Sequence, residues 1–111
     1  MISSDIIRGH LDAIILRLIL EKDRYGYEIS KEISRRTQDR FSIKEATLYA
    51  VFQRLEKKEL ISSYEGDVSL GGRRRSDSMT QLGRAYFHEE VEDWRKAKEI
   101  IDIFMELEER K

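Results

Sequence analysis

The chain has 111 residues, of which 40% are hydrophobic and 39% are charged. This length fits one domain, or one domain with an appended element, and the apolar content with balanced charge excludes a disordered chain. The absence of Cys excludes disulfides, thiolate metal sites and cysteine nucleophiles, and the absence of Pro favours long helices. No apolar run approaches the roughly 20 residues of a transmembrane helix, and the first residues lack the features of a signal peptide. We therefore expect a helix-rich cytoplasmic protein that does not enter the membrane.

The net charge of −1 is a poor guide to partners, because the charges are unevenly distributed along the chain. Residues 31–75 hold eleven basic and seven acidic side chains, whereas residues 81–111 hold six basic and nine acidic ones. Phosphate binding depends on the local patch of charge and not on the total. The middle of the chain is therefore the candidate nucleic-acid surface.

The apolar spacing predicts a first helix over residues 3–20. One face carries a regular stripe of apolar side chains, namely Ile7, Leu11, Ile14, Ile15 and Leu18. Leu16, Ile19 and Leu20 make the far side apolar as well. A helix that is apolar on all sides is buried on more than one of them, which predicts a second partner surface.

Two shorter helices are predicted next, over about residues 26–36 and from Ser42 to about Lys58. The third helix is predicted to begin with a capping box formed by Ser42 and Glu45. Its inward face is apolar, with Leu48, Val51, Phe52 and Leu55. Its outward face is small or polar, with Ala46, Ala50, Gln53 and Lys57. This outward face allows the helix backbone to approach another surface closely.

Residues 60–64 and 73–79 are predicted to form an antiparallel hairpin around a glycine-containing loop at 66–72. Thr80 is predicted to cap a fourth helix that runs from Gln81 nearly to the end. At ~1.5 Å per residue, some thirty residues would extend about 45 Å, which is more than so small a domain covers with its own core. Apolar side chains recur at the three- and four-residue steps of a helix-pairing seam: Phe87, Val91, Trp94, Ala97, Ile101 and Phe104. The seam predicts a homodimer interface.

Enzyme motifs are incomplete in this sequence. Residues 88–92 are similar to a zinc-protease motif, but Glu92 stands where the second His is required, and a solvated helix face is the simpler interpretation. The glycines at 71 and 72 are not followed by the Lys-Ser/Thr pair of a phosphate-binding loop. His10 and Asp12 have no nucleophile in register. We therefore expect no enzymatic activity, no cofactor and no metal.

The order of three helices, a hairpin and a long helix is typical of a winged helix-turn-helix, a mostly α fold with a small β-hairpin. In this fold the third helix enters the DNA major groove and the hairpin, or wing, follows the backbone. Arginine side chains suit phosphate oxygens or a narrow minor groove, and Arg73, Arg74 and Arg75 follow the glycines of the hairpin. A solvated, charged turn is the alternative interpretation of these arginines. We predict a DNA-binding domain over residues 1–80 and a C-terminal dimerisation helix over residues 81–111.

The sequence resembles the PadR-family winged-helix transcriptional regulators over nearly its whole length. The strongest match is residues 46–61, which read Ala-Thr-Leu-Tyr followed by Arg-Leu-Glu and Leu-Ile, and are similar to the family's Gly-Thr-Leu-Tyr-Pro…Arg-Leu-Glu…Gly-Leu-Ile recognition-helix signature. Further matches are residues 11–16, 25–29, 71–75 and 79–83. The short C-terminal part resembles the compact branch of the family that includes multidrug-responsive repressors.

This resemblance implies a ligand site between two subunits. In that branch a tryptophan from each C-terminal helix lines a pore and stacks on planar, apolar and often cationic compounds, and Trp94 stands at the matching position. Ala13 and Arg17 are the candidate ligand contacts on the first helix. The ligand class stays open, because a cation at Arg17 would repel cationic drugs.

The sequence also departs from the family pattern. Ala46, Ala50 and Glu59 replace the usual Gly, Pro and Gly, and none of these changes stops a helix. Ser76 and Asp77 stand where the wing usually has two tyrosines. Asp77 is expected to bring negative charge close to the DNA backbone, which puts the contribution of the wing in doubt.

The leading hypothesis is a homodimeric, ligand-responsive regulator, a repressor, that binds a palindromic operator in double-stranded DNA. Lys44 and Gln53 are predicted to reach base edges, while Thr47 and Tyr49 hold phosphates and the three arginines supply the wing contacts. The predicted dimer interface packs the seam of the last helix against the partner's first helix, and consists of Ile7, Leu11, Val91, Ala97, Ile101 and Phe104. The alternative is a winged-helix adaptor for protein interaction or dimerisation, without sequence-specific DNA binding.

Overall fold

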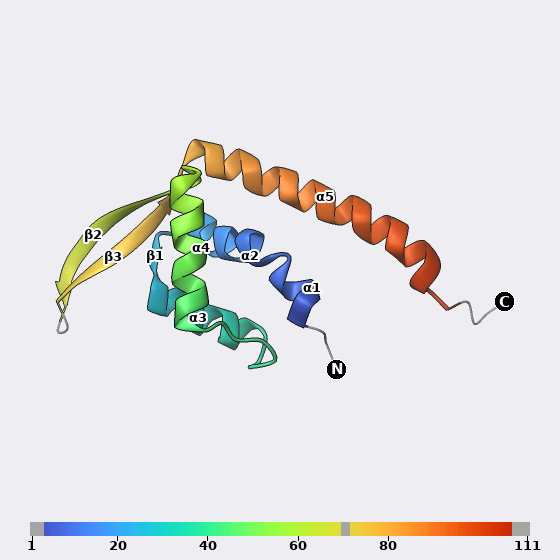
Figure 1. The fold of residues 1–111 in the computed structure, drawn as a ribbon, viewed down its shortest axis with the longest axis horizontal. Helices are drawn as coiled ribbons and strands as arrows, with labels where there is room; N and C mark the ends of the chain where they lie inside the picture. The colour runs from blue at the N-terminus through green and yellow to red at the C-terminus, as the bar shows by residue number, and fades with distance from the viewer. Residues whose placement is uncertain (1–3, 70–71, 108–111) are drawn as a thin grey trace.

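The computed structural model describes residues 4–69 and 72–107, without the side chains of Ser4 and of residues 66–74. Within these ranges the chain is mostly helical, with a small antiparallel sheet (Figure 1). The elements follow in the order α1 (Ser4–Arg8), α2 (Leu11–Glu21), β1 (Arg24–Tyr25), α3 (Gly26–Arg36), α4 (Glu45–Lys57), β2 (Ile61–Ser69), β3 (Gly72–Met79) and α5 (Gln81–Met105). This is the predicted winged helix-turn-helix, with a long helix after the wing.

The predicted first helix is two helices in the structure, because the chain breaks at Gly9 and His10. Gly is a poor helix former. The ring of His10 donates a hydrogen bond from Nδ1 to the Ile6 carbonyl at 2.9 Å, which helps to close the end of α1. His10 then serves as the N-cap residue of α2.

Helix α2 is the centre of the core and packs against α5, β3 and α4 of its own chain. Its Ile15 and Leu16 are fully buried. The apolar far side that predicted a second partner surface is therefore largely explained within a single chain. The partly buried residues Ala13 and Ile14 lie instead beside an open hollow described below.

Helices α3 and α4 form the helix-turn-helix pair. Helix α3 has the predicted bounds, and Glu28 accepts a hydrogen bond from the Tyr25 amide at 3.1 Å at its start. The predicted capping box at Ser42 is wrong, because the Leu48 amide donates to the Lys44 carbonyl at 2.9 Å, which makes Lys44 the N-cap residue. The predicted inward face of α4 is confirmed, since all four of its apolar side chains are buried.

The sheet has the strand order β1-β3-β2 and is antiparallel throughout. The predicted hairpin is confirmed, but its strands continue to Ser69 and from Gly72, through most of the predicted loop. Strand β1 was not predicted. It has only two residues, and it pairs Arg24 with Asp77 and Tyr25 with Ser76.

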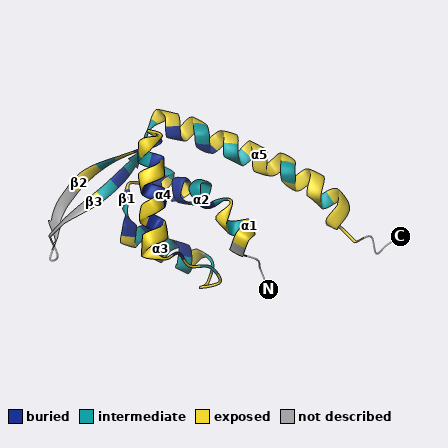
Figure 2. Cartoon of the chain, viewed as in Figure 1, coloured by how far each residue is buried: buried dark blue, intermediate teal, exposed yellow. Residues whose placement is uncertain are grey.

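Helix α5 is joined tightly to the core at its start and leaves it further along (Figure 1). The predicted cap is confirmed, because the Thr80 Oγ1 accepts a hydrogen bond from the Gly83 amide at 2.9 Å. Gly83 lies so close to the end of α4 that a Cβ there would meet the Leu60 carbonyl oxygen at 1.9 Å. Phe87 is buried in the core, whereas the second half of α5 is mostly exposed (Figure 2).

Candidate nucleic-acid interface

The outward face of α4 is exposed to solvent. Lys44, Thr47, Tyr49 and Gln53, the predicted base and phosphate contacts, are all exposed. Tyr49 is 49% exposed, and its ring packs edge-on against Phe52 with ring centroids 6.0 Å apart. The structure thus presents three of these side chains from α4 and the fourth, Lys44, from its N-cap position, all of them accessible.

A second group of exposed side chains was not predicted to contact DNA, and lies at the start of α3. Tyr27 is 65% exposed, and the Lys31 Nζ lies 5.5 Å from the centre of its ring. The Tyr25 ring is stacked against Tyr27 at 6.5 Å between centroids. Gly26 brings this turn beside α4, because a Cβ on Gly26 would lie 3.4 Å from the Tyr49 hydroxyl. A phenol and an ammonium beside Tyr49 extend the candidate phosphate-binding surface.

The signal for this second group was present in the sequence. Residues 25–29 carried part of the family resemblance, but their aromatic side chains were not interpreted as contacts. Apolar periodicity identifies the buried side of α3 from Ile29 and Ile33. It does not indicate which exposed residues of the first turn meet the recognition helix, because this depends on the angle between α3 and α4.

The wing arginines differ in what the structure shows of them. Arg73 and Arg74 lie in β3, but their side chains are outside the described part of the chain. The Arg75 guanidinium donates from Nη2 to the Ser63 hydroxyl at 2.8 Å and lies 3.3 Å from the Glu56 carboxylate on α4. Its side chain is 69% exposed. Arg75 therefore bridges the wing and the recognition helix while remaining accessible to a phosphate.

Asp77 does not bring its charge to the DNA backbone, contrary to the sequence-based expectation. It is 1% exposed, because β3 is the middle strand and Asp77 faces the interior between Arg24 and Ser63 of the neighbouring strands. The pKa of Asp77 is raised to about 7, chiefly by burial and in smaller part by the neighbouring Glu56 carboxylate, while the Arg75 charge lowers it slightly. Asp77, which stands where the family resemblance leads one to expect a tyrosine, therefore changes the buried side of the wing.

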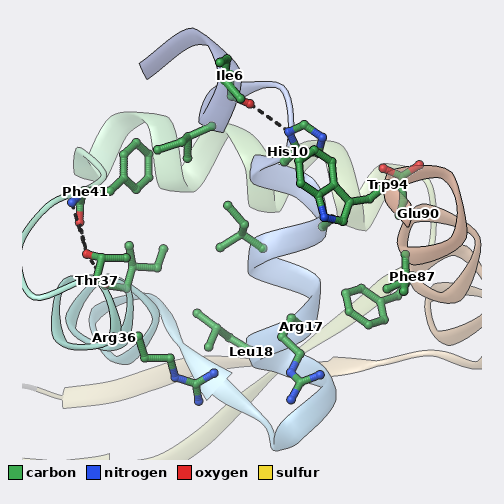
Figure 3. Close-up of a pocket in the computed structure, with 15 residues that line it drawn as sticks. Ile6, His10, Arg17, Leu18, Arg36, Thr37, Phe41, Phe87, Glu90 and Trp94 are labelled. Atoms are coloured by element: carbon green, nitrogen blue, oxygen red, sulfur yellow. Dashed lines mark hydrogen bonds between the residues drawn. The ribbon is translucent and has the colours of Figure 1, made fainter. Parts of the chain in front are cut away.

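A hollow of about 540 Å³ opens between α1, α2, the end of α3 and the middle of α5 (Figure 3). Its lining is mostly apolar and includes the three predicted ligand contacts, Ala13, Arg17 and Trp94. Trp94 is 44% exposed, and the His10 ring meets its ring edge-on at 5.0 Å between centroids. The structure brings residues from distant parts of the sequence together at one concave surface.

Cations at the rim of this hollow are already paired. Arg17 donates to Glu21 at 2.9 Å, and Arg36 donates to the same carboxylate at 2.9 Å. These hydrogen bonds, first from Arg36 and then from Arg17, lower the pKa of Glu21 to about 2. Glu21 thus offsets part of the positive charge of Arg17, but it is shared with Arg36, which lines the same hollow.

The predicted dimer residues fall into three groups in the single chain. Leu11 is 6% exposed and belongs to the core of its own chain. Ile7, Val91 and Ala97 are half-buried. Ile101 and Phe104 are 48% and 78% exposed, beside further exposed apolar residues of α5, namely Ile100, Ile103 and Met105. The second half of α5 therefore carries a continuous apolar surface that its own chain leaves open.

No helix over residues 4–69 and 72–107 has the length and hydrophobicity needed to span a lipid bilayer. In the same part of the chain, His, Asp and Glu side chains form no cluster of three or more that could hold a metal ion.

Comparison with known proteins gives a consistent result. The family model for the transcriptional regulator PadR-like family matches residues 15–89. A transcriptional regulator from Clostridium thermocellum is 45% identical, with a TM-score of 0.88 over 96% of this chain and 100% of that one. A PadR family transcription regulator from Clostridium difficile is 35% identical, with a TM-score of 0.78 over 88% of this chain and 100% of that one. Uncharacterized protein X of Lysinibacillus sphaericus is 71% identical over 96% of this chain and 97% of its own length. The chain belongs to the PadR-like family of transcriptional regulators and has its DNA-binding winged-helix fold.

Proposed function

We propose that the protein is a cytoplasmic repressor that acts as a homodimer on a palindromic operator. The observation that carries this proposal is the combination of an accessible recognition helix with an uncovered apolar seam in one chain. In this proposal residues 1–80 bind DNA and residues 81–111 hold two chains together. A two-fold axis between the chains would set their α4 helices about 34 Å apart, which is one turn of the duplex.

The proposed interface packs the second half of α5 against α1 and α2 of the partner. Ile101 and Phe104 would supply the main apolar contacts, and Ile7, Val91 and Ala97 would lie at its margin. Leu11 contributes through its own core and not by direct contact. Each large apolar side chain buried in this way stabilises the dimer by roughly 1.5–3 kcal/mol.

The proposed DNA contacts divide into base and phosphate contacts. Lys44, the N-cap residue of α4, and Gln53 within α4 would reach base edges, with Lys suited to guanine and Gln to adenine. Thr47 and Tyr49 would hold phosphates, as would the arginines of the wing. Because phosphate contacts release counterions, binding should weaken steeply with salt.

The test is a titration of labelled promoter duplex at several salt concentrations, followed by fluorescence anisotropy. The double variant Arg73→Ala, Arg74→Ala should weaken binding to every duplex and reduce the slope of log affinity against log salt by about 2, since each lost phosphate contact removes about 0.9. Arg95→Ala is the matched control, because Arg95 is an exposed arginine of α5 that pairs with Glu92. A slope unchanged in the double variant would remove the wing from the proposal.

The same titration separates this proposal from an adaptor that does not read DNA. The pairing of Arg75 with Glu56 and of Arg54 with Asp12 favours the adaptor, because both cations already have partners beside the proposed DNA surface. An adaptor would bind any duplex weakly and with little dependence on salt. Steep, sequence-dependent binding would exclude it.

We also propose that a planar, hydrophobic ligand enters the hollow beside Trp94 and releases the operator. A ligand wedged between α2 and α5 would change the spacing of the two recognition helices, and so favour a dimer that no longer matches the operator. The tryptophan fluorescence of the protein comes from Trp94 alone. Planar aromatic compounds should quench it in a saturable way, and Trp94→Ala should abolish their binding as measured by calorimetry. Quenching that does not saturate would leave Trp94 as a packing residue.

A further inference from the structure

We propose that the hollow beside Trp94 binds a carboxylic acid with an apolar body, and that the carboxylate of this ligand lies against Arg17 and Arg36. This inference rests on the proposed function, because it names the chemical class of the ligand that enters the same hollow. The charge of this ligand is opposite to that of the cationic compounds that the family resemblance suggests.

Two guanidinium groups meet at one end of the hollow and share a single carboxylate oxygen. Arg17 Nε and Arg36 Nη1 each donate to Glu21 Oε2 at 2.9 Å. Both arginines line the hollow, whereas Glu21 does not. Figure 3 shows the two arginine side chains on the same side of the hollow. This end of the wall therefore presents two cations to a ligand, and the carboxylate that joins them lies outside the lining.

Positive charge exceeds negative charge around this end of the hollow. Glu21 also accepts a hydrogen bond from Arg24 Nη2 at 3.1 Å, so three guanidinium groups converge on one carboxylate. Glu32 lies 3.2 Å from Arg36, but it pairs more closely with Arg35, at 2.7 Å. Four arginines and two glutamates form this network of ion pairs, which leaves two positive charges unbalanced. A local excess of positive charge attracts an anion.

Arg17 has donors left for a ligand. Its side chain is 58% exposed. Within the described part of the chain, only its Nε donates to an acceptor, and its two Nη groups have none. A guanidinium has five N–H donors and can hold a carboxylate through two of them. The carboxylate of a ligand can therefore bind Arg17 without displacing Glu21.

The remaining wall of the hollow suits an apolar body. It consists mainly of aliphatic and aromatic side chains, among them Ile14, Leu18, Ile33 and Phe87. Glu90 is the only acidic residue of the lining among the described residues, and it lies one turn before Trp94 on α5. Figure 3 shows Glu90 beside Trp94 and away from the two arginines. A ligand carboxylate at the arginines is thus separated from Glu90, whereas a ligand cation there would meet two like charges.

The experiment compares compounds that share one apolar body and differ in charge, by titration calorimetry of the protein without DNA. The probes are 2-naphthoate, 2-naphthalenemethanol and 2-naphthylmethylammonium. 2-Naphthoate should bind roughly tenfold more tightly than the neutral alcohol, because hydrogen bonds between charged groups contribute more than neutral ones. The ammonium compound should bind most weakly. Dodecanoate, a fourth probe, tests whether the body of the acid can be linear instead of planar.

Variants of Arg17 make the outcome specific. Arg17→Gln removes the charge and should weaken the binding of 2-naphthoate roughly tenfold, while the binding of 2-naphthalenemethanol stays unchanged. Arg17→Lys keeps the charge and should restore most of the affinity for the acid. Arg95→Gln is the matched control, because Arg95 is an exposed arginine of α5 outside the lining of the hollow. It should change neither affinity, and thermal melts verify that each variant is folded.

The failures are distinguishable. If the three naphthalene compounds bind equally, or the ammonium compound binds best, the inference is wrong and the proposed ligand site stands. If dodecanoate alone binds, and Arg17→Gln weakens it, the inference stands and the planar shape in the proposed function is wrong. If none of the four probes binds, the inference and the proposed ligand site fail together, and operator binding is still judged by the salt titration. An advantage of 2-naphthoate that Arg17→Gln removes and Arg95→Gln retains is the expected result.

Discussion

The winged-helix part of the chain and the second half of α5 use similar apolar periodicity with opposite results. In the first, Ile15, Leu16 and Leu55 are fully buried by neighbouring elements of the same chain. In the second, Ile103 and Phe104 are 72% and 78% exposed. The difference lies in the presence of a neighbour and not in the pattern itself. Periodicity shows which face of a helix is apolar, but the three-dimensional arrangement determines whether that face is covered within the chain.

The largest expected effect follows from charging the uncovered surface. The double variant Ile101→Asp, Phe104→Asp should convert the dimer to single chains and weaken operator binding by more than a hundredfold, because it removes roughly 3–6 kcal/mol of apolar burial per chain. Sedimentation and anisotropy measure the two effects. Glu99→Ala, on the opposite side of α5, is the control and should change neither. A charged variant that remains dimeric would place the contact elsewhere.

The joint between the two regions provides the next prediction. Gly83→Ala should destabilise the fold by about 3 kcal/mol, since the new Cβ would overlap the Leu60 carbonyl oxygen and force α5 away from the core. Chemical denaturation at a fixed protein concentration measures the change. Gly9→Ala is the matched control, because a Cβ at Gly9 meets no atom closer than 3.6 Å. Equal stability of the two variants would contradict the tight joint.

The smallest effect concerns the cap of α5. Thr80→Ala should cost about 1 kcal/mol, a usual value for the loss of an N-cap hydroxyl. The Thr80 Oγ1 accepts from the Gly83 amide and donates to the Glu59 carbonyl at 2.7 Å. Thr80→Ser keeps both hydrogen bonds and should be nearly neutral by the same denaturation assay. A loss in Thr80→Ser as large as in Thr80→Ala would show that the methyl group, and not the hydroxyl, stabilises the joint.

The sequence predicted most of the fold correctly, because apolar spacing and turn residues act locally. The bounds of α3, the inward face of α4, the hairpin and the Thr80 cap all followed from nearby residues. The break at Gly9 and the displaced start of α4 did not, since a single glycine is tolerated in many helices and a serine near a helix start has several competing roles.

The candidate site was less predictable, because its decisive features depend on packing between distant segments. Strand β1 is two residues long and exists only through its pairing with β3. Asp77 lies between two half-buried serines of the wing, but its position on the middle strand turns it inward and buries it. The grouping of Ala13, Arg17 and Trp94 around one hollow was anticipated from the family resemblance and not from spacing along the chain.

The most direct test of the account is sedimentation equilibrium of the wild-type protein, without DNA, at micromolar concentration. If the second half of α5 is covered by a second copy, the protein will sediment at twice the 13.2 kDa mass of one chain. A single species at the mass of one chain would contradict the dimer, and with it the paired recognition helices on which operator binding depends.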